Sequence, residues 1–314
     1  MKASSYNRAQ VNIKRILVVG GGTMGRGIAG LCALSGFETA IFEADTEARG
    51  RLRDSIESSW RRAAARGKLS AEEIEAAGGL LRILDRLEEE AGAEIAIEAV
   101  PESLPLKQRV FESLDRLCPP EAVLASNTSS LSIAALGRAT RRPDRVVGIH
   151  FFNPVSAMPL VEVVSSPETS GETEEAAVAF ARGLGKQAIR VADSPGFATS
   201  RLGLALGLEA MRMVEEGVAS PGDLDRAMEL GYGHRMGPLK TSDLVGLDVR
   251  LSIAETLASH LSEERFRPPA ILRRLVAQGF TGKKSGRGFF RWEGDTPVET
   301  EPGAGDRKSG TERQ

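Results

Sequence analysis

Short apolar runs alternate with longer stretches of helical spacing along the first 190 residues. The runs are rich in Val, Ile, Leu and Ala, as is typical of strands buried on both faces. They lie at 14–19, 39–43, 94–98, 121–125, 146–150 and 160–164. Because helical patterns separate most of them, this order predicts an α/β fold with a Rossmann-type doubly wound sheet.

The stretch 46–87 is longer than a simple crossover between two strands. Its charged pattern predicts two helices, from Thr46 to Arg66 and from Ser70 to Ala77. Ser70 and Glu73 have the spacing of a capping box, which marks the start of the second helix. We expect this helical arm to reach over a ligand.

The pattern changes after the Pro-Gly pair at 195–196. Helices are expected over 201–216, from Ser220 and Pro221 onward, over 243–261 and over 269–278, with no strand pattern between them. From about residue 293 the chain is rich in Gly, Pro, Thr and charge, which predicts disorder. The expected parts are a sheet domain over 13–194, an all-helical C-terminal domain over 195–292 and a disordered tail over 293–314.

An early segment, V-V-G-G-G-T-M-G, joins the end of the first apolar run to a helical pattern. It supplies G-x-G-x-x-G in the strand–turn–helix context that binds the pyrophosphate of a dinucleotide. Gly20 permits the tight turn, Gly22 lets the backbone approach the phosphates, and Gly25 lets helix and strand touch. Thr23 and Met24, at the start of the helix, are expected to contact the same cofactor. A plain glycine-rich turn is the alternative.

Glu43 follows the second apolar run, about where an acid that binds the adenine ribose should lie. A carboxylate can accept hydrogen bonds from a free ribose diol but would repel a 2′-phosphate. The sequence therefore predicts NAD rather than NADP. Asp45 is the competing candidate, although Asp45 and Thr46 look more like the start of a helix.

The composition narrows the class of protein. The 314 residues carry a formal net charge of −2, which gives no electrostatic reason to expect binding to nucleic acid. The sequence shows no pattern of a basic amphipathic helix that would bind a membrane surface. Residues 1–8 lack the apolar core of a signal peptide, so we expect a cytoplasmic protein. Cys32 and Cys118 lack the spacing of metal ligands; we expect small buried side chains and no metal.

Two ionisable residues stand within the late apolar runs. His150 ends one run, and Glu162 lies inside the next, where a buried charge needs a partner. If the chain reverses between Asn153 and Pro159, the two side chains can meet. A carboxylate paired to an imidazole fixes its tautomer and suits it to take a proton from an alcohol. The alternative is a buried pair that only satisfies the core.

Seven motifs together resemble the 3-hydroxyacyl-CoA dehydrogenase family. They are G-G-G-T-M-G-R-G-I-A from residue 20, A-S-N-T-S-S-L at 125–131, H-F-F-N-P at 150–154, L-V-E-V-V at 160–164, S-P-G-F at 194–197, M-G-P-L at 236–239 and G-K-K-S-G at 282–286. Their order is that of the family over about residues 13 to 292. The resemblance implies oxidation of an L-3-hydroxyacyl-CoA, with a short acyl chain such as 3-hydroxybutyryl, to the 3-ketoacyl-CoA with NAD.

The resemblance also implies roles for residues near the predicted base. His150 is similar to the family's general base and Glu162 to the acid that orients it. Ser129 and Asn153 match residues that hydrogen-bond the reacting substrate. From the pattern alone, Ser129 or Ser130 could instead cap a helix, and Asn153 could be a turn former.

Other matches concern the cofactor. Glu102 and Lys107 resemble residues that bracket the nicotinamide ribose, and Asn127 matches a further cofactor contact. From the pattern alone, Glu102 and Lys107 would belong to a solvated helix start.

Ser59 and Arg66 match positions that contact CoA, and their spacing of seven would place both on one face of a helix. An ordinary solvated surface is the alternative. Ser200 stands where many family members have Asn, and its shorter side chain puts a direct substrate contact in doubt. Pro159 stands where Lys is common, a departure that we do not interpret.

Two other functions stay open at this point. One is a dehydrogenase of a free hydroxy or sugar acid, like the gulonate dehydrogenases, and the other is a catalytically idle NAD-binding protein. The helix from Leu202 to Val214 and those after it are more hydrophobic than a small domain needs on its own. They predict a homodimer through residues 197–292.

Overall fold

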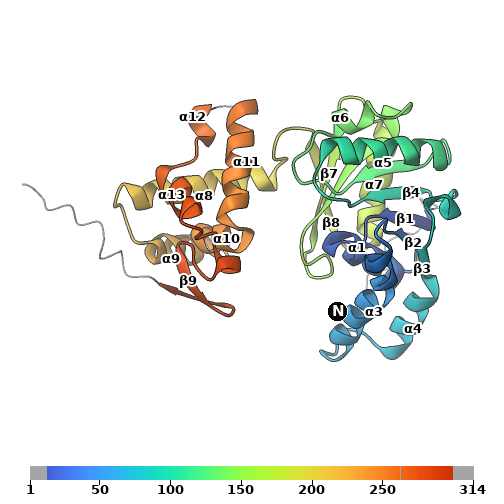
Figure 1. The fold of residues 1–314 in the computed structure, drawn as a ribbon, viewed down its shortest axis with the longest axis horizontal. Coiled ribbons are helices and arrows are strands. Elements are labelled where there is room, and N and C mark those ends of the chain that lie inside the picture. Colours follow the sequence, from blue (N-terminus) through green and yellow to red (C-terminus); the bar gives the residue numbers. More distant parts are fainter. Residues whose placement is uncertain (1–12, 262, 300–314) are drawn as a thin grey trace, which may run out of the picture. The chain divides into compact units, whose positions relative to one another are not determined.

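The computed structural model describes residues 13–261 and 263–299. Contacts between residues divide the chain into two compact units, Met1–Phe197 and Ala198–Gln314. Figure 1 shows the elements of both units. The first holds a sheet with flanking helices, and the second is mainly helical, so the predicted fold class is confirmed.

The sheet of the first unit has eight strands in the order β3-β2-β1-β4-β5-β6-β7-β8. Neighbouring strands run parallel except β6 and β7, which are antiparallel. The strands are β1 (Arg15–Val19), β2 (Glu38–Phe42), β3 (Leu81–Leu84), β4 (Ile95–Glu98), β5 (Val123–Ser126), β6 (Val146–Phe151), β7 (Leu160–Ser165) and β8 (Gln187–Ala192).

Helices cover both faces of this sheet. They are α1 (Thr23–Leu34), α2 (Thr46–Gly50), α3 (Leu52–Ala64), α4 (Ala71–Leu80), α5 (Leu104–Leu117), α6 (Ile133–Gly137) and α7 (Gly171–Gly183). Short 3₁₀ turns lie at Leu87–Glu90 and Pro143–Arg145.

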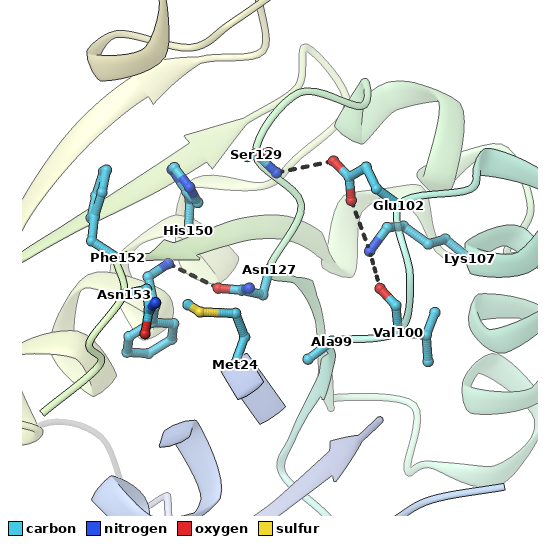
Figure 2. A pocket seen from close by; sticks show the side chains of 11 residues that line it. Met24, Ala99, Val100, Glu102, Lys107, Asn127, Ser129, His150, Phe152 and Asn153 are labelled. Atoms are coloured by element: carbon cyan, nitrogen blue, oxygen red, sulfur yellow. Dashed lines mark hydrogen bonds and ion pairs between the residues drawn. The ribbon is translucent and has the colours of Figure 1, made fainter. Parts of the chain in front are cut away.

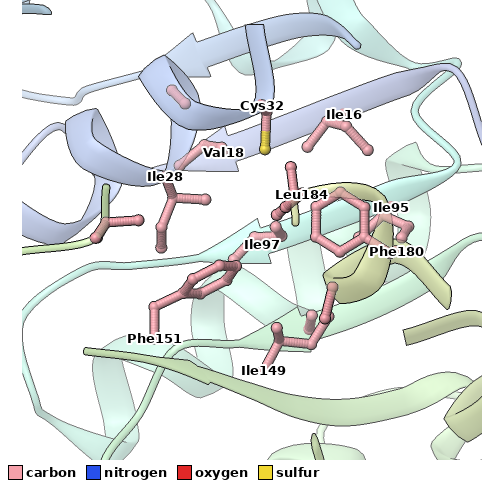
Figure 3. Close-up of a cluster of buried hydrophobic side chains, with 14 of the residues drawn as sticks. Ile16, Val18, Ile28, Cys32, Ile95, Ile97, Ile149, Phe151, Phe180 and Leu184 are labelled. Carbon is pink, nitrogen blue, oxygen red and sulfur yellow. The ribbon is translucent and has the colours of Figure 1, made fainter. Parts of the chain in front are cut away.

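Strand alternation builds a separate apolar core on each face. Ile16 and Val18 of β1 pack with side chains of α1 and α7, a cluster drawn in Figure 3. Leu17 and Val19 of the same strand pack with side chains of α5 and α6 on the opposite face. The near-continuous apolar sequence of the central strands therefore matches burial on both sides.

The sequence analysis did not predict strands β3 and β8, because each lies at an edge of the sheet. Edge strands bury only part of their surface and need no continuous apolar run. β3 has only four residues, and β8 alternates polar with apolar side chains, most of them partly or fully exposed. The arm also differs from the prediction, since the chain breaks at Arg51 between α2 and α3, and α3 ends at Ala64.

Local predictions for the first unit are confirmed at several points. Asp45 caps α2 by accepting a hydrogen bond from the backbone of Ala48. Ser70 and Glu73 form the predicted capping box of α4. Cys32 and Cys118 are buried free thiols, and burial raises the pKa of each, that of Cys118 to about 11.

The second unit consists of helices followed by a hairpin. Its elements are α8 (Thr199–Glu215), α9 (Pro221–Tyr232), α10 (Pro238–Val245), α11 (Leu247–His260), α12 (Glu263–Phe266), α13 (Ala270–Ala277), a 3₁₀ turn at Lys283–Ser285, β9 (Phe290–Glu293) and β10 (Thr296–Glu299). The predicted helix over 243–261 is wrong as a single element. Gly246, with φ of 103°, separates α10 from α11.

The hairpin corrects two predictions, that no strand follows residue 197 and that disorder begins at 293. β9 and β10 pair antiparallel, and Phe290 and Trp292 alternate with exposed residues so that both point into the core. The carboxylate of Asp243 accepts hydrogen bonds at 3.0 Å from the backbone of Phe289 and Phe290 and from Trp292 Nε1. The rest of the predicted tail, 300–314, lies outside the described residues.

Candidate active site

The glycine-rich turn leaves room for a ligand at one position and none at two others. Gly20 has a φ of 107°, and a Cβ there would lie 2.7 Å from the carbonyl carbon of Ala99. A Cβ at position 25 would lie 1.8 Å from the carbonyl oxygen of Gly20. Gly22 is the N-cap of α1, and the space where its Cβ would lie is open. It has no side chain to cap the first N–H groups of the helix. The turn therefore offers backbone N–H groups to an anion, as a pyrophosphate requires.

Glu43 lies directly beside this turn. Its Oε2 accepts a hydrogen bond from the backbone N–H of Gly21 at 2.7 Å, and its Oε1 accepts one from Asp45 at 3.0 Å. Asp45 is occupied as a helix cap, whereas the carboxylate of Glu43 is held at the end of β2 against the glycines. This position favours Glu43 over Asp45 as the acid that faces a ribose.

His150 and Glu162 are cross-strand partners in the antiparallel pair of β6 and β7. His150 Nδ1 lies 2.7 Å from Glu162 Oε2, and the two residues are 7% and 0% exposed. The carboxylate accepts from Nδ1, so the neutral imidazole carries its lone pair on Nε2. The reversal that the sequence predicts between 153 and 159 thus brings the two side chains together.

A pocket of about 370 Å³ opens at the carboxyl ends of β1, β4, β5 and β6. Most of the predicted catalytic and nicotinamide-side residues lie around it (Figure 2). Its lining consists of Met24, Ala99, Val100, Glu102, Lys107, Asn127, Ser129, His150, Phe151, Phe152 and Asn153. Ligands of open α/β sheets bind at this edge, outside the carboxyl ends of the strands.

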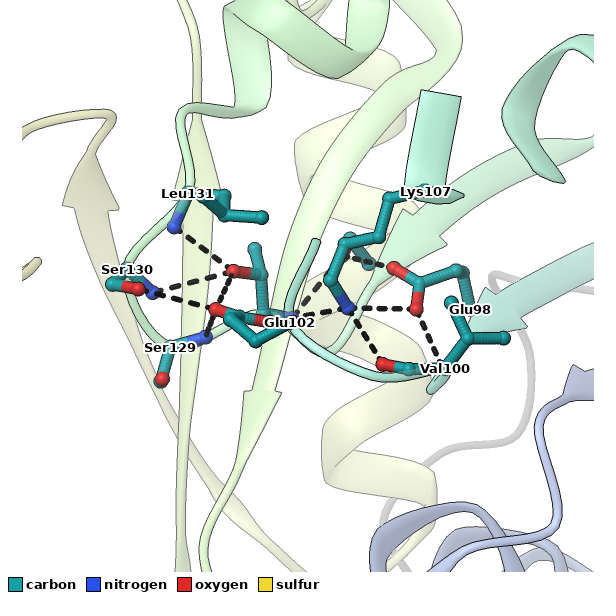
Figure 4. Close-up of polar contacts among 9 residues, drawn as sticks. Glu98, Val100, Glu102, Lys107, Ser129, Ser130 and Leu131 are labelled. Atoms are coloured by element: carbon teal, nitrogen blue, oxygen red, sulfur yellow. Dashed lines mark hydrogen bonds and ion pairs between the residues drawn. The ribbon is translucent and has the colours of Figure 1, made fainter. Parts of the chain in front are cut away.

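Lys107 is 1% exposed, so the solvated alternative for this residue is wrong. Its ammonium lies 2.7 Å from Glu98 Oε1, 3.1 Å from the carbonyl oxygen of Val100 and 3.2 Å from Glu102 Oε2 (Figure 4). These three acceptors use all three of its N–H donors. Glu98, which the sequence analysis missed, is 0% exposed and also accepts from the hydroxyl of Ser126 at 2.6 Å.

Glu102 connects this lysine to the turn after β5. Its Oε1 accepts from the hydroxyl of Thr128 at 2.5 Å and from the backbone of Ser129 at 3.2 Å. Burial alone would raise the pKa of Glu102, but the Lys107 ammonium and these hydrogen bonds hold it below its ordinary value. Glu102 is therefore a carboxylate at neutral pH.

Neither Ser129 nor Ser130 caps the next helix. Ser132 is the cap of α6, because its hydroxyl accepts from the backbone of Ala135 at 3.2 Å. Ser129 is exposed at the pocket, with its side chain left for another partner. The capping alternative for Ser129 is wrong.

Asn127 joins the ends of two neighbouring strands. Its Oδ1 accepts a hydrogen bond from the backbone N–H of Phe151 at 2.9 Å. Asn153 lies two residues beyond, at the exposed rim of the same pocket. The side-chain amide of Asn127 retains its N–H donors for a ligand, since its oxygen supplies this bond.

Family models match both units of the chain. The NAD-binding domain of 3-hydroxyacyl-CoA dehydrogenase matches residues 15–194, and the C-terminal domain of the same family matches residues 196–292. The chain belongs to the 3-hydroxyacyl-CoA dehydrogenase family. It contains the family's NAD-binding domain, and no helix within 13–261 or 263–299 is long and apolar enough to cross a membrane.

Relatives of known name support the assignment over nearly the whole chain. A probable 3-hydroxybutyryl-CoA dehydrogenase of Bacillus subtilis is 43% identical over 286 residues, which cover 91% of this chain and all of that protein. The 3-hydroxybutyryl-CoA dehydrogenase of Mycobacterium tuberculosis is 43% identical over 285 residues, with 89% and 99% covered. The crystal structure of (S)-3-hydroxybutyryl-CoA dehydrogenase from Ralstonia eutropha superposes with a TM-score of 0.86 at 35% identity, covering 90% of this chain and all of that one.

The predicted CoA contacts are not among the residues that line the pocket. Ser59 is exposed on α3, whereas Arg66 lies beyond the end of that helix, so the argument that both share one helix face is wrong. Ser200 lies in the first turn of α8, in the second unit. The structure thus assembles the predicted base and nicotinamide-side residues within the first unit, and Ser59, Arg66 and Ser200 are not among the residues that line this pocket.

Proposed function

We propose that this protein oxidises a short-chain L-3-hydroxyacyl-CoA, such as 3-hydroxybutyryl-CoA, to the 3-ketoacyl-CoA with NAD. The observation that carries the proposal is the buried His150–Glu162 pair, which faces a pocket at the carboxyl edge of an NAD-binding sheet. The names of the relatives point to the same substrate class.

In the proposed reaction His150 is the general base. Its Nε2 takes the proton of the 3-hydroxyl group while the C–H bond breaks and the C=O bond forms. Bound NAD supplies the hydride acceptor. Glu162 keeps the proton on Nδ1 and stabilises the imidazolium that forms, which lowers the barrier without any change in its own protonation. Ser129 and Asn153 are positioned at the rim of the pocket and are proposed to hydrogen-bond the reacting oxygen.

The cofactor site is proposed from the first two strand ends. The Gly20–Gly25 turn would hold the pyrophosphate with Thr23 and Met24, and Glu43 would bind the adenine ribose. Replacing Glu43 by Ser and Ala44 by Arg should therefore move preference from NAD toward NADP, measured as the ratio of kcat/KM for the two cofactors. An unchanged ratio would assign the ribose contact to Asp45 instead.

The nicotinamide side is proposed to contain Glu102, Lys107 and Asn127. Because every N–H of Lys107 is used inside the protein, we assign Lys107 a positioning role and Glu102 the direct contact with the ribose. Asn127 would donate through its free amide N–H groups.

Ser59, Arg66 and Ser200 remain proposed contacts of the acyl-CoA on the family resemblance alone. Ser200→Asn is expected to change KM or kcat by less than tenfold, because the natural chain already accommodates the shorter side chain. A hundredfold gain would show that the natural sequence is a weakened dehydrogenase for the thioester assayed, or has another substrate.

The decisive experiment measures NADH formation with a panel of 3-hydroxyacyl-CoA thioesters and the corresponding free acids. The proposal expects turnover of the thioesters only, with the short chains preferred. Turnover of a free hydroxy acid at a similar rate would contradict it and favour the gulonate-type alternative. No turnover with any substrate, together with normal NAD binding, would favour an idle binding protein.

We also propose that the second unit forms a homodimer. Several of its apolar side chains are exposed, among them Leu202 at 71%, Leu230 at 84% and Tyr232 at 80%, more than a lone small domain favours. Light scattering at micromolar concentration should give the mass of two chains, and a monomer would contradict the proposal. A cytoplasmic location stays a prediction that cell fractionation would test.

A further inference from the structure

Carboxylates outnumber cations around the described pocket. The charged side chains that line it are Glu102 and Lys107, and those that bond directly to a lining side chain add Glu98 and Glu162. Glu162 is paired with His150, and the rest of this set contains two carboxylates, Glu98 and Glu102, and one ammonium. The pocket wall therefore carries an excess of negative charge.

The single ammonium cannot neutralise the whole set. Lys107 lies closest to Glu98, at 2.7 Å, and both are almost fully buried. Glu102 is 3.2 Å from the same ammonium through Oε2, yet its side chain is 39% exposed and lines the pocket. Glu98 and Lys107 thus balance each other, and Glu102 is the carboxylate whose charge is left for a ligand.

The excess charge lies where the reactive ring of the cofactor must bind. The hydride leaves C3 of the substrate and the proton leaves the hydroxyl oxygen bonded to C3, so the nicotinamide has to approach the substrate held by His150. His150 and Glu102 line one pocket. Nicotinamide is a pyridinium cation in NAD⁺ and a neutral ring in NADH, so a carboxylate at this place interacts more favourably with the oxidised form.

We propose that the charge of Glu102 shifts the relative affinity of the pocket toward the oxidised cofactor, in addition to any hydrogen bond that it offers to the ribose. The inference rests on the proposed function, because it places the nicotinamide beside His150. The proposal predicts unequal effects on the binding of the two forms of the cofactor. Removal of the charge weakens NAD⁺ binding more than NADH binding, whereas removal of the hydrogen bond alone weakens both equally.

The test measures dissociation constants of NAD⁺ and NADH by calorimetric titration of the protein without substrate. Glu102→Gln removes the charge at constant size, and the ratio of the NADH to the NAD⁺ dissociation constant should fall about five- to tenfold, as expected for unit charges about 6 to 9 Å apart at an effective dielectric constant of about 40, between the values for a protein surface and for water. Glu102→Asp keeps the charge and should lower both affinities with the ratio unchanged. Glu102→Ala serves as a second uncharged variant should Glu102→Gln fail to fold.

Glu112→Gln is the matched control, because it removes the same charge from an exposed position on α5, the helix that begins two residues after Glu102. It should leave the ratio unchanged. Equal weakening of NAD⁺ and NADH in Glu102→Gln and Glu102→Ala would overturn the inference. Wild-type turnover of 3-hydroxybutyryl-CoA is measured in parallel: if turnover is absent but the ratio shifts, the proposed substrate fails and the electrostatic inference stands.

Discussion

Two buried carboxylates on the same sheet differ in the hydrogen-bonding capacity that their partner side chains retain. Glu98 ends β4 and Glu162 lies inside β7; both are 0% exposed, and each lies 2.7 Å from a nitrogen of its partner. Lys107 donates all three of its N–H groups to protein oxygens, whereas His150 bonds to Glu162 through Nδ1 alone. Near-identical pairs thus hold a fixed charge in one case and, in the proposed reaction, a proton acceptor in the other.

The comparison also shows why burial alone does not identify a catalytic pair. Desolvation opposes both pairs, and a buried ion pair adds little net stability over an apolar replacement. Removal of one partner is costly in both cases, because it leaves a charge without compensation. Only the second ring nitrogen of His150, at the pocket, distinguishes the chemistry, so substitutions of His150, Glu162 and Lys107 should separate the two pairs.

The largest effect is expected at His150. His150→Gln removes the proton acceptor and should lower kcat about a thousandfold, within the range that general-base catalysis contributes. The dissociation constant of NAD should stay within about twofold of the wild type. Steady-state kinetics and calorimetry measure the two quantities, and the exposed His260→Gln is the control. A loss of less than tenfold would show that His150 is not the base.

Glu162→Gln should lower kcat nearly as far, about a hundredfold, since an amide orients the ring less well and does not stabilise the imidazolium. The pH dependence of kcat should also shift, because the imidazole becomes less basic. Exposed Glu168→Gln provides the comparison. If the rate and its pH profile were both unchanged in Glu162→Gln, the pair would be structural.

Lys107→Met should act on cofactor binding rather than on proton transfer. We expect about tenfold weaker NAD binding and a lower unfolding midpoint, because Glu98 loses its compensating charge. The pH profile of kcat should keep its shape, unlike that of Glu162→Gln. The exposed Arg109→Met on the same helix is the control. A displaced pH profile in Lys107→Met would contradict the distinction between the two pairs.

The smallest effect concerns the acid stability of the network around Lys107. The pKa of Glu102 in the folded protein lies below its ordinary value of 4.5, so ionised Glu102 stabilises the fold above that pH, and this contribution is lost as the pH falls through the lowered pKa. Wild type should therefore lose stability relative to Glu102→Gln as the pH falls below 4.5 and passes through the lowered pKa of Glu102. Urea unfolding at several pH values measures the difference, and a constant difference would contradict the assigned shift.

The two pairs also show how far the sequence could predict the site. Glu162 stands in the middle of an apolar run, where an ionisable residue signals a buried partner, and the prediction of its contact with His150 is confirmed. Glu98 gives the same signal, but it ends its run, where exposure is the usual outcome. Its burial depends on the neighbouring strands and on Lys107 from α5, which are long-range contacts without a local pattern.

The fold follows the same division between local and long-range causes. The buried central strands, the caps of α2, α4 and α9, and the glycine turn have local signatures, and all were predicted. The edge strands β3 and β8 have no such signature, because pairing with a neighbour defines them. The β9–β10 hairpin does show alternation at Phe290 and Trp292, a signal that the polar composition of the adjoining segment obscured.

The bonds of Asp243 to the last strands bear on the order in which the chain folds during synthesis. The first unit has its complete sheet and both apolar clusters once residue 197 has been made. The core of the second unit requires Phe289, Phe290 and Trp292, and without them Asp243 would be a buried carboxylate short of three donors. Its folding therefore has to wait until residue 292 has been made, while the dinucleotide-binding unit can fold on the ribosome before that point.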